Sequence, residues 1–108
     1  MRVGAHVFVS GTTAVDRSGN VVSPHDAYLQ AKHILSVISS TLAKTGATLA
    51  DVVRIRIFVT DIATHAESVG RAHSEVFGSV QPACTMVEVS RLIDERLLVE
   101  IEAEALIA

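Results

Sequence analysis

The segment Val52-Val53-Arg54-Ile55-Arg56-Ile57-Phe58-Val59 alternates between two sets of side chains. One set is wholly aliphatic and the other contains both arginines; the aliphatic set is Val53, Ile55, Ile57 and Val59. A period of two residues is typical of a β-strand with one face against a core. Residues 97–105 have the same period, because their apolar positions alternate with Glu100, Glu102 and Glu104. Both segments are therefore predicted to be strands of a half-buried sheet.

Two other segments show the period of amphipathic helices. The first is predicted to have Ser23 as its N-cap and Pro24 at its first position, and to stop at Gly46. Its apolar face is Ala27, Ala31, Ile34, Leu35, Ile38 and Leu42. The second covers residues 65–77, with an inner face of Val69, Ala72, Val76 and Phe77. Because each helix has one apolar face, both are predicted to cover the same side of the sheet.

Shorter strands complete the predicted fold. Residues 6–10 and 21–22 are predicted to form a hairpin around a turn at 16–20, and residues 85–89 a further strand. This order of elements indicates an α+β fold with a mixed β-sheet and two helices packed on one face. The opposite face is expected to carry Arg54, Arg56, Phe58, Met86, Glu88, Glu100, Glu102 and Glu104. Because that face mixes charged and apolar residues, we expect other subunits to cover it.

The composition indicates one globular domain, residues 1–108, and excludes several classes of protein. Apolar residues make up 49% of the chain and charged residues 19%, which excludes a disordered chain. A net charge of −3, no tryptophan and no run of basic residues argue against nucleic-acid binding. The apolar runs are too short to cross a bilayer. We therefore expect no membrane partner. The single cysteine, Cys84, cannot form an internal disulfide, which is typical of a protein in the reducing cytoplasm, so we expect a cytoplasmic location.

Five short motifs follow one another in the order and at the spacing of a known family. They are Ser10-Gly11, Gly46-Ala47-Thr48 before Val52-Val53-Arg54-Ile55, Asp61, Pro82-Ala83 before Thr85-Met86-Val87-Glu88-Val89, and Val99-Glu100-Ile101-Glu102-Ala103. In this pattern the chain resembles the RidA/YjgF (Rid, L-PSP endoribonuclease-like) family over nearly its whole length. The resemblance implies a chorismate-mutase-like α+β subunit. It also implies a homotrimer whose three clefts, between neighbouring subunits, bind a small-molecule ligand.

The resemblance further implies an activity. Members of the RidA branch hydrolyse 2-imino acids or their enamines to 2-keto acids and ammonia, without a metal or cofactor. Glu100 matches the carboxylate that positions the attacking water. Where the RidA branch has Pro-Ala-Arg, this chain has Pro82-Ala83-Cys84, and a thiol cannot hold a carboxylate as a guanidinium does. The chain is therefore interpreted as a divergent member, and strict 2-imino acid deaminase activity is disfavoured.

The predicted site combines these matches with the residues beside them. Glu100 is the predicted catalytic residue, and the predicted substrate-binding residues are Ser10, Gly11, Cys84, Thr85 and Met86. Glu102 and Glu104 are interpreted as solvated or as ion-pair partners of the two strand arginines. Cys84 is interpreted as a small buried or cleft-lining residue rather than a nucleophile. The five histidines lack metal-ligand spacing, so no metal site is predicted.

Three functions stay open at this point. The first is cofactor-free hydrolytic deamination of an enamine- or imine-type compound. The second is a non-catalytic trimer that binds a small molecule or has a regulatory role. The third, ribonuclease activity, follows from the older family label, and the acidic charge and 4% aromatic content argue against it.

Overall fold

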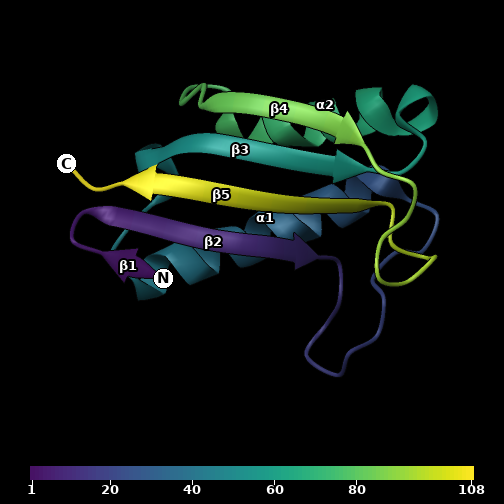
Figure 1. The fold of residues 1–108 in the computed structure, drawn as a ribbon, viewed down its shortest axis with the longest axis horizontal. Helices are drawn as coiled ribbons and strands as arrows, with labels where there is room; N and C mark the ends of the chain where they lie inside the picture. The colour runs from purple at the N-terminus through teal and green to yellow at the C-terminus, as the bar shows by residue number, and fades with distance from the viewer.

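A computed structural model describes residues 1–108. Its sheet has five strands in the order β1-β2-β5-β3-β4, antiparallel except for the parallel pair β3–β4. The strands are β1 (Arg2–Val3), β2 (His6–Thr13), β3 (Val52–Val59), β4 (Ala83–Glu88) and β5 (Val99–Leu106). The helices are α1 (Ala27–Lys44), α2 (Ile62–Phe77) and the short 3-10 helix η1 (Leu49–Asp51). Both long helices lie behind the sheet in Figure 1, so the predicted α+β arrangement is confirmed.

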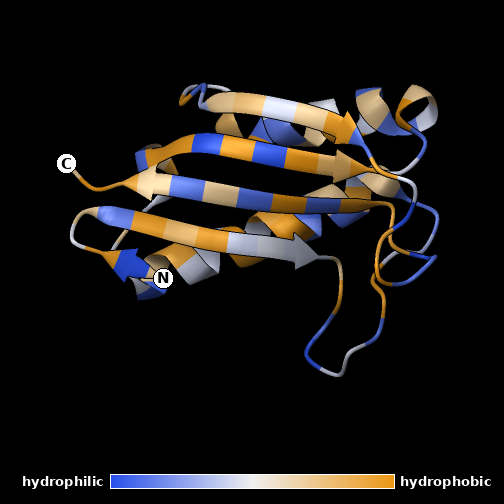
Figure 2. Ribbon diagram, viewed as in Figure 1, coloured by the Kyte–Doolittle hydropathy of each residue, from blue (hydrophilic) through white to orange (hydrophobic).

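The core lies between the sheet and the two long helices. α1 packs on β2 and β5, and α2 packs on β3 and β4. The alternation along β3 and β5, visible in Figure 2, directs one aliphatic set of side chains into this layer. At the start of β3, however, Val52 is buried and Val53 is 45% exposed. The prediction for Val53 is wrong because the β3–β5 register shifts between Val52 and Arg54, which reverses the pattern there.

Helix α1 begins later than the sequence pattern predicted. Asp26, not Ser23, is the N-cap, and its carboxylate accepts a hydrogen bond of 2.9 Å from the Leu29 amide. Ser23 and His25 both have positive φ, 46° and 71°, so the chain turns before the helix starts. The predicted apolar face is buried along its whole length. The helix stops as predicted, because Gly46 takes a φ of 88° just after the C-cap.

The remaining boundaries differ by a few residues from the predictions. α2 begins at Ile62 rather than at residue 65, and β4 begins at Ala83. The predicted hairpin around residues 16–20 is reduced to one bridge, Val15↔Val21, while Arg2–Val3 forms the small edge strand instead. None of the helices combines the length and the apolar character that crossing a membrane requires.

Candidate functional site

The sheet face that the helices leave uncovered, here called the open face, carries a row of charged side chains. Cross-strand register places Arg54 opposite Glu104, Arg56 opposite Glu102, and Phe58 opposite Glu100. Paired residues in a sheet point to the same side, so these six side chains share the open face. The prediction that β3 and β5 send their charged residues away from the helices is thus confirmed.

Arg56 sits between two of the glutamates. Its Nη1 atom donates to Glu102 Oε1 at 2.9 Å and lies 3.5 Å from Glu104 Oε1. Glu104 also lies 3.8 Å from His6 Nε2. These partly exposed pairs stabilise the fold only weakly, about 0–1 kcal/mol each. They confirm the interpretation of Glu102 and Glu104 as ion-pair partners of a strand arginine.

Glu100 differs from the other two glutamates of β5. Its carboxylate makes no hydrogen bond or ion pair within the chain, although the side chain is half-buried. It lies directly against the backbone of Gly11: a Cβ added at Gly11 would come within 2.5 Å of Glu100 Oε2. Thr13 and Phe58 are its register neighbours on either side. An unpartnered carboxylate in this position is free to accept a hydrogen bond from water or a ligand.

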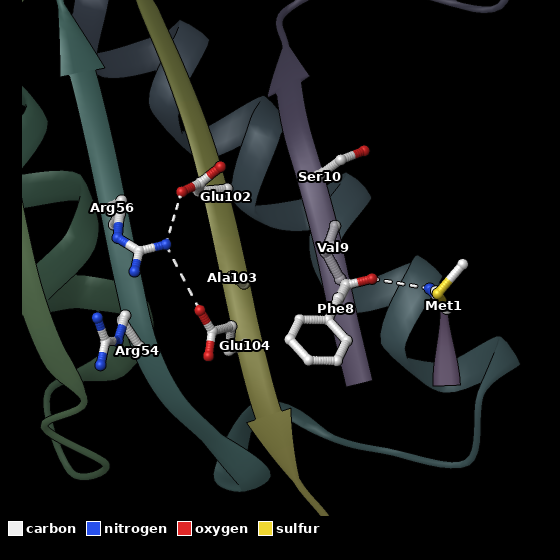
Figure 3. A pocket seen from close by; sticks show the side chains of 9 residues that line it. All are labelled: Met1, Phe8, Val9, Ser10, Arg54, Arg56, Glu102, Ala103 and Glu104. Atoms are coloured by element: carbon white, nitrogen blue, oxygen red, sulfur yellow. Dashed lines mark hydrogen bonds and ion pairs between the residues drawn. The ribbon is translucent and has the colours of Figure 1, made fainter. Parts of the chain in front are cut away.

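A hollow of about 400 Å³ lies at the other end of the same face. It is called the open-face hollow here, and Figure 3 shows the side chains around it. Residues of β2, β5 and β3 line it together with Met1: Phe8, Val9, Ser10, Glu102, Ala103, Glu104, Arg54 and Arg56. Ser10 lines this hollow while the adjacent Gly11 contacts Glu100, so the β2 bulge between Val9 and Thr12 joins the two regions.

The structure divides the sequence-predicted site residues between the two sides of the sheet. Gly11 and Glu100 are in contact and Ser10 adjoins them. Thr85 is in register with Arg56 and so lies on the open face. Cys84 and Met86 are in register with Ile55 and Ile57, whose side chains face the helices. Within one chain, therefore, Cys84 and Met86 are not brought together with Glu100.

Met86 and Glu88 had been expected on the open face, and this expectation is wrong. β4 is parallel to β3 with Val59 opposite Glu88, so Met86 and Glu88 follow the buried set of β3. Met86 packs against the core. Glu88 Oε1 accepts a hydrogen bond of 3.0 Å from the Ile62 amide, at the first residue of α2. The sequence pattern could not show this, because the alternation in β4 is weak and its register depends on β3.

Cys84 lies on the edge strand β4 and is exposed. The interpretation of Cys84 as a buried residue is therefore wrong for the single chain. Desolvation nevertheless raises the pKa of its thiol, which keeps the thiolate scarce near neutral pH. This agrees with the interpretation that Cys84 is not a nucleophile. No group of three or more potential metal-ligating side chains is assembled in the structure.

Of the residues that line the open-face hollow, only Ser10 was a predicted site residue, and Phe8 and Arg54 are two of the residues that the sequence reasoning missed. Phe8 is 41% exposed and stacks on His6, with ring centroids 4.5 Å apart. The alternation Val7-Phe8-Val9 could have placed Phe8 opposite the core, but nothing in the sequence linked it to β3. Arg54 makes no hydrogen bond or ion pair within the chain.

Comparisons with known proteins agree on one family. The family model described as Endoribonuclease L-PSP matches residues 1–107. A RutC family protein of Pyrococcus abyssi is 34% identical over 105 residues, which are 97% of this chain and 81% of that protein. A solved structure of a YjgF/YER057c/UK114 family member from Mycobacterium tuberculosis is 44% identical, with a TM-score of 0.87, and the match covers 98% of this chain and 82% of that one. The structure of TdcF from E. coli, with bound serine, is 26% identical with a TM-score of 0.89, covering 100% of this chain and 85% of that one.

Proposed function

The chain belongs to the Endoribonuclease L-PSP (YjgF/Rid) family, and from this premise we propose that it is a cofactor-free hydrolytic deaminase of a small enamine- or imine-type metabolite. The reaction takes place in the cytoplasm, in clefts between the subunits of a homotrimer. Glu100 is the catalytic residue in this proposal. Ser10, Gly11, Cys84, Thr85 and Met86 contribute substrate contacts from two subunits.

The observation that carries the proposal is the unpartnered carboxylate of Glu100. Glu102 and Glu104 are held by Arg56, whereas Glu100 has no cation beside it and rests on the Gly11 backbone. A side chain at position 11 would occupy the space of this carboxylate, so glycine allows the two strands to hold it in place. A carboxylate with free lone pairs and an aromatic neighbour, Phe58, is suited to orient a water molecule.

The chemistry requires only proton transfer and water. Glu100 accepts a proton from the water as its oxygen bonds to the C=N carbon, and the π electrons move to nitrogen. The proton returns to nitrogen and gives a carbinolamine. Glu100 then transfers the hydroxyl proton to the amine nitrogen as the C–N bond breaks, so a carbonyl compound and ammonia leave. The Glu100 carboxylate is regenerated in its ionised form, so the reaction consumes no oxidant, reductant or metal.

The separation of Cys84 from Glu100 supports a site between subunits. The two residues point to opposite sides of one sheet, so a ligand can meet both only if a second copy contributes one of them. Cys84 also replaces the arginine of the Pro-Ala-Arg motif, so the substrate needs no carboxylate at that position. The related protein TdcF was solved with bound serine, which supports a ligand of small-metabolite size.

A coupled deaminase assay tests the proposal. An amino-acid oxidase generates 2-imino acids in place, and semicarbazide traps those that remain unhydrolysed. A reduction of the trapped product by the wild-type protein that is abolished in Glu100→Gln would show that the cleft hydrolyses these imines without the arginine. Glu67→Gln, which changes an exposed glutamate of α2, serves as the matched control and is expected to retain activity. Activity that survives in Glu100→Gln would refute the role of Glu100.

A third variant and a sizing measurement complete this test. Cys84→Arg restores the family arginine, and activity gained only in this variant would indicate a cleft adapted to a ligand without that carboxylate. Light scattering should give the mass of a trimer. A monodisperse monomer would contradict the proposed cleft, because that cleft needs two subunits.

The alternative is a non-catalytic binding or regulatory trimer, which the missing arginine favours. It predicts ligand binding that Glu100→Gln leaves intact and no product at any protein concentration. Ribonuclease activity would have to survive further purification and be lost in a point variant. Activity that disappears on purification alone would be a contaminant.

A further inference from the structure

Glu100 lies in a row of four side chains that crosses the sheet and contains no cation. Thr13 of β2 and Phe58 of β3 are in register with Glu100, and Val87 of β4 is in register with Phe58. Residues in register point to the same side of a sheet, so all four share the open face. Glu100 is half-buried, and Val87 is 43% exposed. The row therefore offers one carboxylate, one hydroxyl and two apolar groups.

The arginines of the open face do not supply a counter-ion to Glu100. Arg56 Nη1 lies 2.9 Å from Glu102 and 3.5 Å from Glu104, so its charge is already shared by two carboxylates. Arg54 is opposite Glu104, which is four residues from Glu100 along β5, about 13 Å at the usual strand rise. No ion pair of the chain includes Glu100.

The strand side that the proposed function assigns to the second subunit also lacks a cation. Cys84, Met86 and Glu88 alternate along the side of β4 that is opposite to the open face. Burial raises the pKa of the Cys84 thiol, so this side chain stays neutral. Glu88 adds a carboxylate, which accepts a hydrogen bond of 3.0 Å from the Ile62 amide. Neither of the two sets of residues that face the proposed cleft therefore contains a basic side chain.

This charge pattern favours one class of substrate. A 2-imino acid has a carboxylate, which would lie near Glu100 without a basic partner and would be repelled. A protonated imine is a cation, which the Glu100 carboxylate attracts and the Phe58 ring can contact through its face. The apolar surfaces of Phe58 and Val87 suit an alkyl substituent.

Resting on the deaminase function proposed above, we propose that the substrate is the protonated imine of an alkyl amine that carries no carboxylate. Its hydrolysis is balanced: R–CH=NH₂⁺ and water give an aldehyde, R–CHO, and ammonium. The class of reaction that must supply this substrate is the two-electron oxidation of a primary amine to an imine. In that reaction a flavin or quinone cofactor of a second enzyme accepts the electrons.

The test compares two stable ligands that have the same alkyl group and opposite charges. 3-Methylbutanamidine is a cation that resembles the protonated imine, and 4-methyl-2-oxopentanoate is an anion that carries the carboxylate. Binding of each to the protein in its native oligomeric state is measured by calorimetry, and amide chemical shifts locate the site. The amidine is expected to bind at least about tenfold more tightly than the oxo acid. The shifts should concentrate at Gly11, Phe58, Val87 and Glu100.

Three variants make the test specific. Glu100→Gln should weaken amidine binding about tenfold or more, because glutamine keeps the shape of the side chain and loses its charge. Cys84→Arg, which introduces a guanidinium into the proposed cleft, should reverse the preference in favour of the oxo acid. Glu67→Gln, at an exposed position of α2, should change neither affinity.

The outcomes separate this inference from the deaminase function. Equal affinity for the two ligands, tighter binding of the oxo acid, or no binding at millimolar amidine would each overturn the inference. Glu100-dependent hydrolysis of 2-imino acids would then still support deamination. Selective amidine binding would support the cationic ligand class. If 3-methylbutan-1-imine, generated from the amine by an amine oxidase, is nevertheless not hydrolysed, the proposed reaction is refuted.

Discussion

The two faces of the sheet are built by the same strands and have opposite chemistry. On β3 and β5, the side facing the helices carries only aliphatic residues, nearly all without solvent exposure. The other side of the same strands carries two arginines, a phenylalanine and three glutamates, none of them fully buried. The covered face thus supplies stability through burial. In the single chain, the open face holds charges without partners, because these side chains are not buried and keep contact with water.

The largest expected effect comes from truncating the covered face. Ile57→Ala should lower the free energy of unfolding by about 2–5 kcal/mol, because Ile57 is fully buried and a cavity would remain. Phe58→Ala, its neighbour on the open face, should cost less than half as much. Urea unfolding at several protein concentrations measures both. Equal losses would show that Phe58 is also buried in solution, and the contrast between the faces would then hold only for the single chain.

A smaller effect is expected at the one polar residue that lies in the core. Gln30 is fully buried; its amide donates to the Ser23 and Arg96 carbonyls and accepts from the Leu98 amide at 2.8 Å. Gln30→Leu would leave these backbone groups unpaired and should cost about 1–3 kcal/mol. Ser40→Ala, on the exposed side of α1, is the control and should change stability by less than about 0.5 kcal/mol. A neutral Gln30→Leu would mean that water replaces the lost partners.

Two glycines sharpen the comparison between stability and function. An added Cβ at Gly70, in α2, meets no atom within 4 Å, so Gly70→Ala should stabilise the protein by roughly 0.5–1 kcal/mol. Gly11→Ala should instead displace the Glu100 carboxylate and reduce deaminase activity with little change in melting temperature. Thermal unfolding and the coupled assay, run on both variants, give the result. Full activity in Gly11→Ala would show that the position of Glu100 does not matter.

The smallest effect concerns an exposed ion pair outside both faces. Hydrogen bonds from the Arg96 side chain, at 2.8 and 3.1 Å, and from its amide lower the pKa of Asp94 to about 2. Because the folded-state pKa is depressed, the stabilisation is complete above the ordinary value of 3.8 and is lost as the pH falls toward 2. Carbon-detected NMR titration should show this midpoint, and Arg96→Gln should raise it. An unchanged midpoint would exclude Arg96 as the cause.

Most of the fold could be predicted from local patterns. The alternation of β3 and β5 and the apolar stripe of α1 each identify an element and its buried side. The errors occur where a residue's burial or role depends on contacts with another strand or with a nearby residue, which the local pattern does not show. Val53 is exposed because of a register shift against β5, and Ser23 does not cap α1 because Asp26 does.

The candidate site could be predicted only in part. Of the predicted site residues, Gly11 and Glu100 are in contact, and Ser10 precedes Gly11 and lines the open-face hollow. The hollow at Arg54 and Phe8 could not be foreseen, because its residues come from three strands that are distant in sequence. Which glutamate remains unpartnered also depends on the direction that the Arg56 side chain takes.

By itself, the sequence determined the two long helices, the longer strands, most of the buried set of the central strands and the family. Side-chain period and hydrophobicity act between residues a few positions apart, and these properties can be read along the chain. The tertiary structure decided which charges meet. Strand order and register bring Arg56 to Glu102, leave Arg54 and Glu100 without partners, and place Cys84 on the opposite side from Glu100. The physical reason is that ion pairing acts over a few ångströms in space, and only the assembled sheet sets those distances.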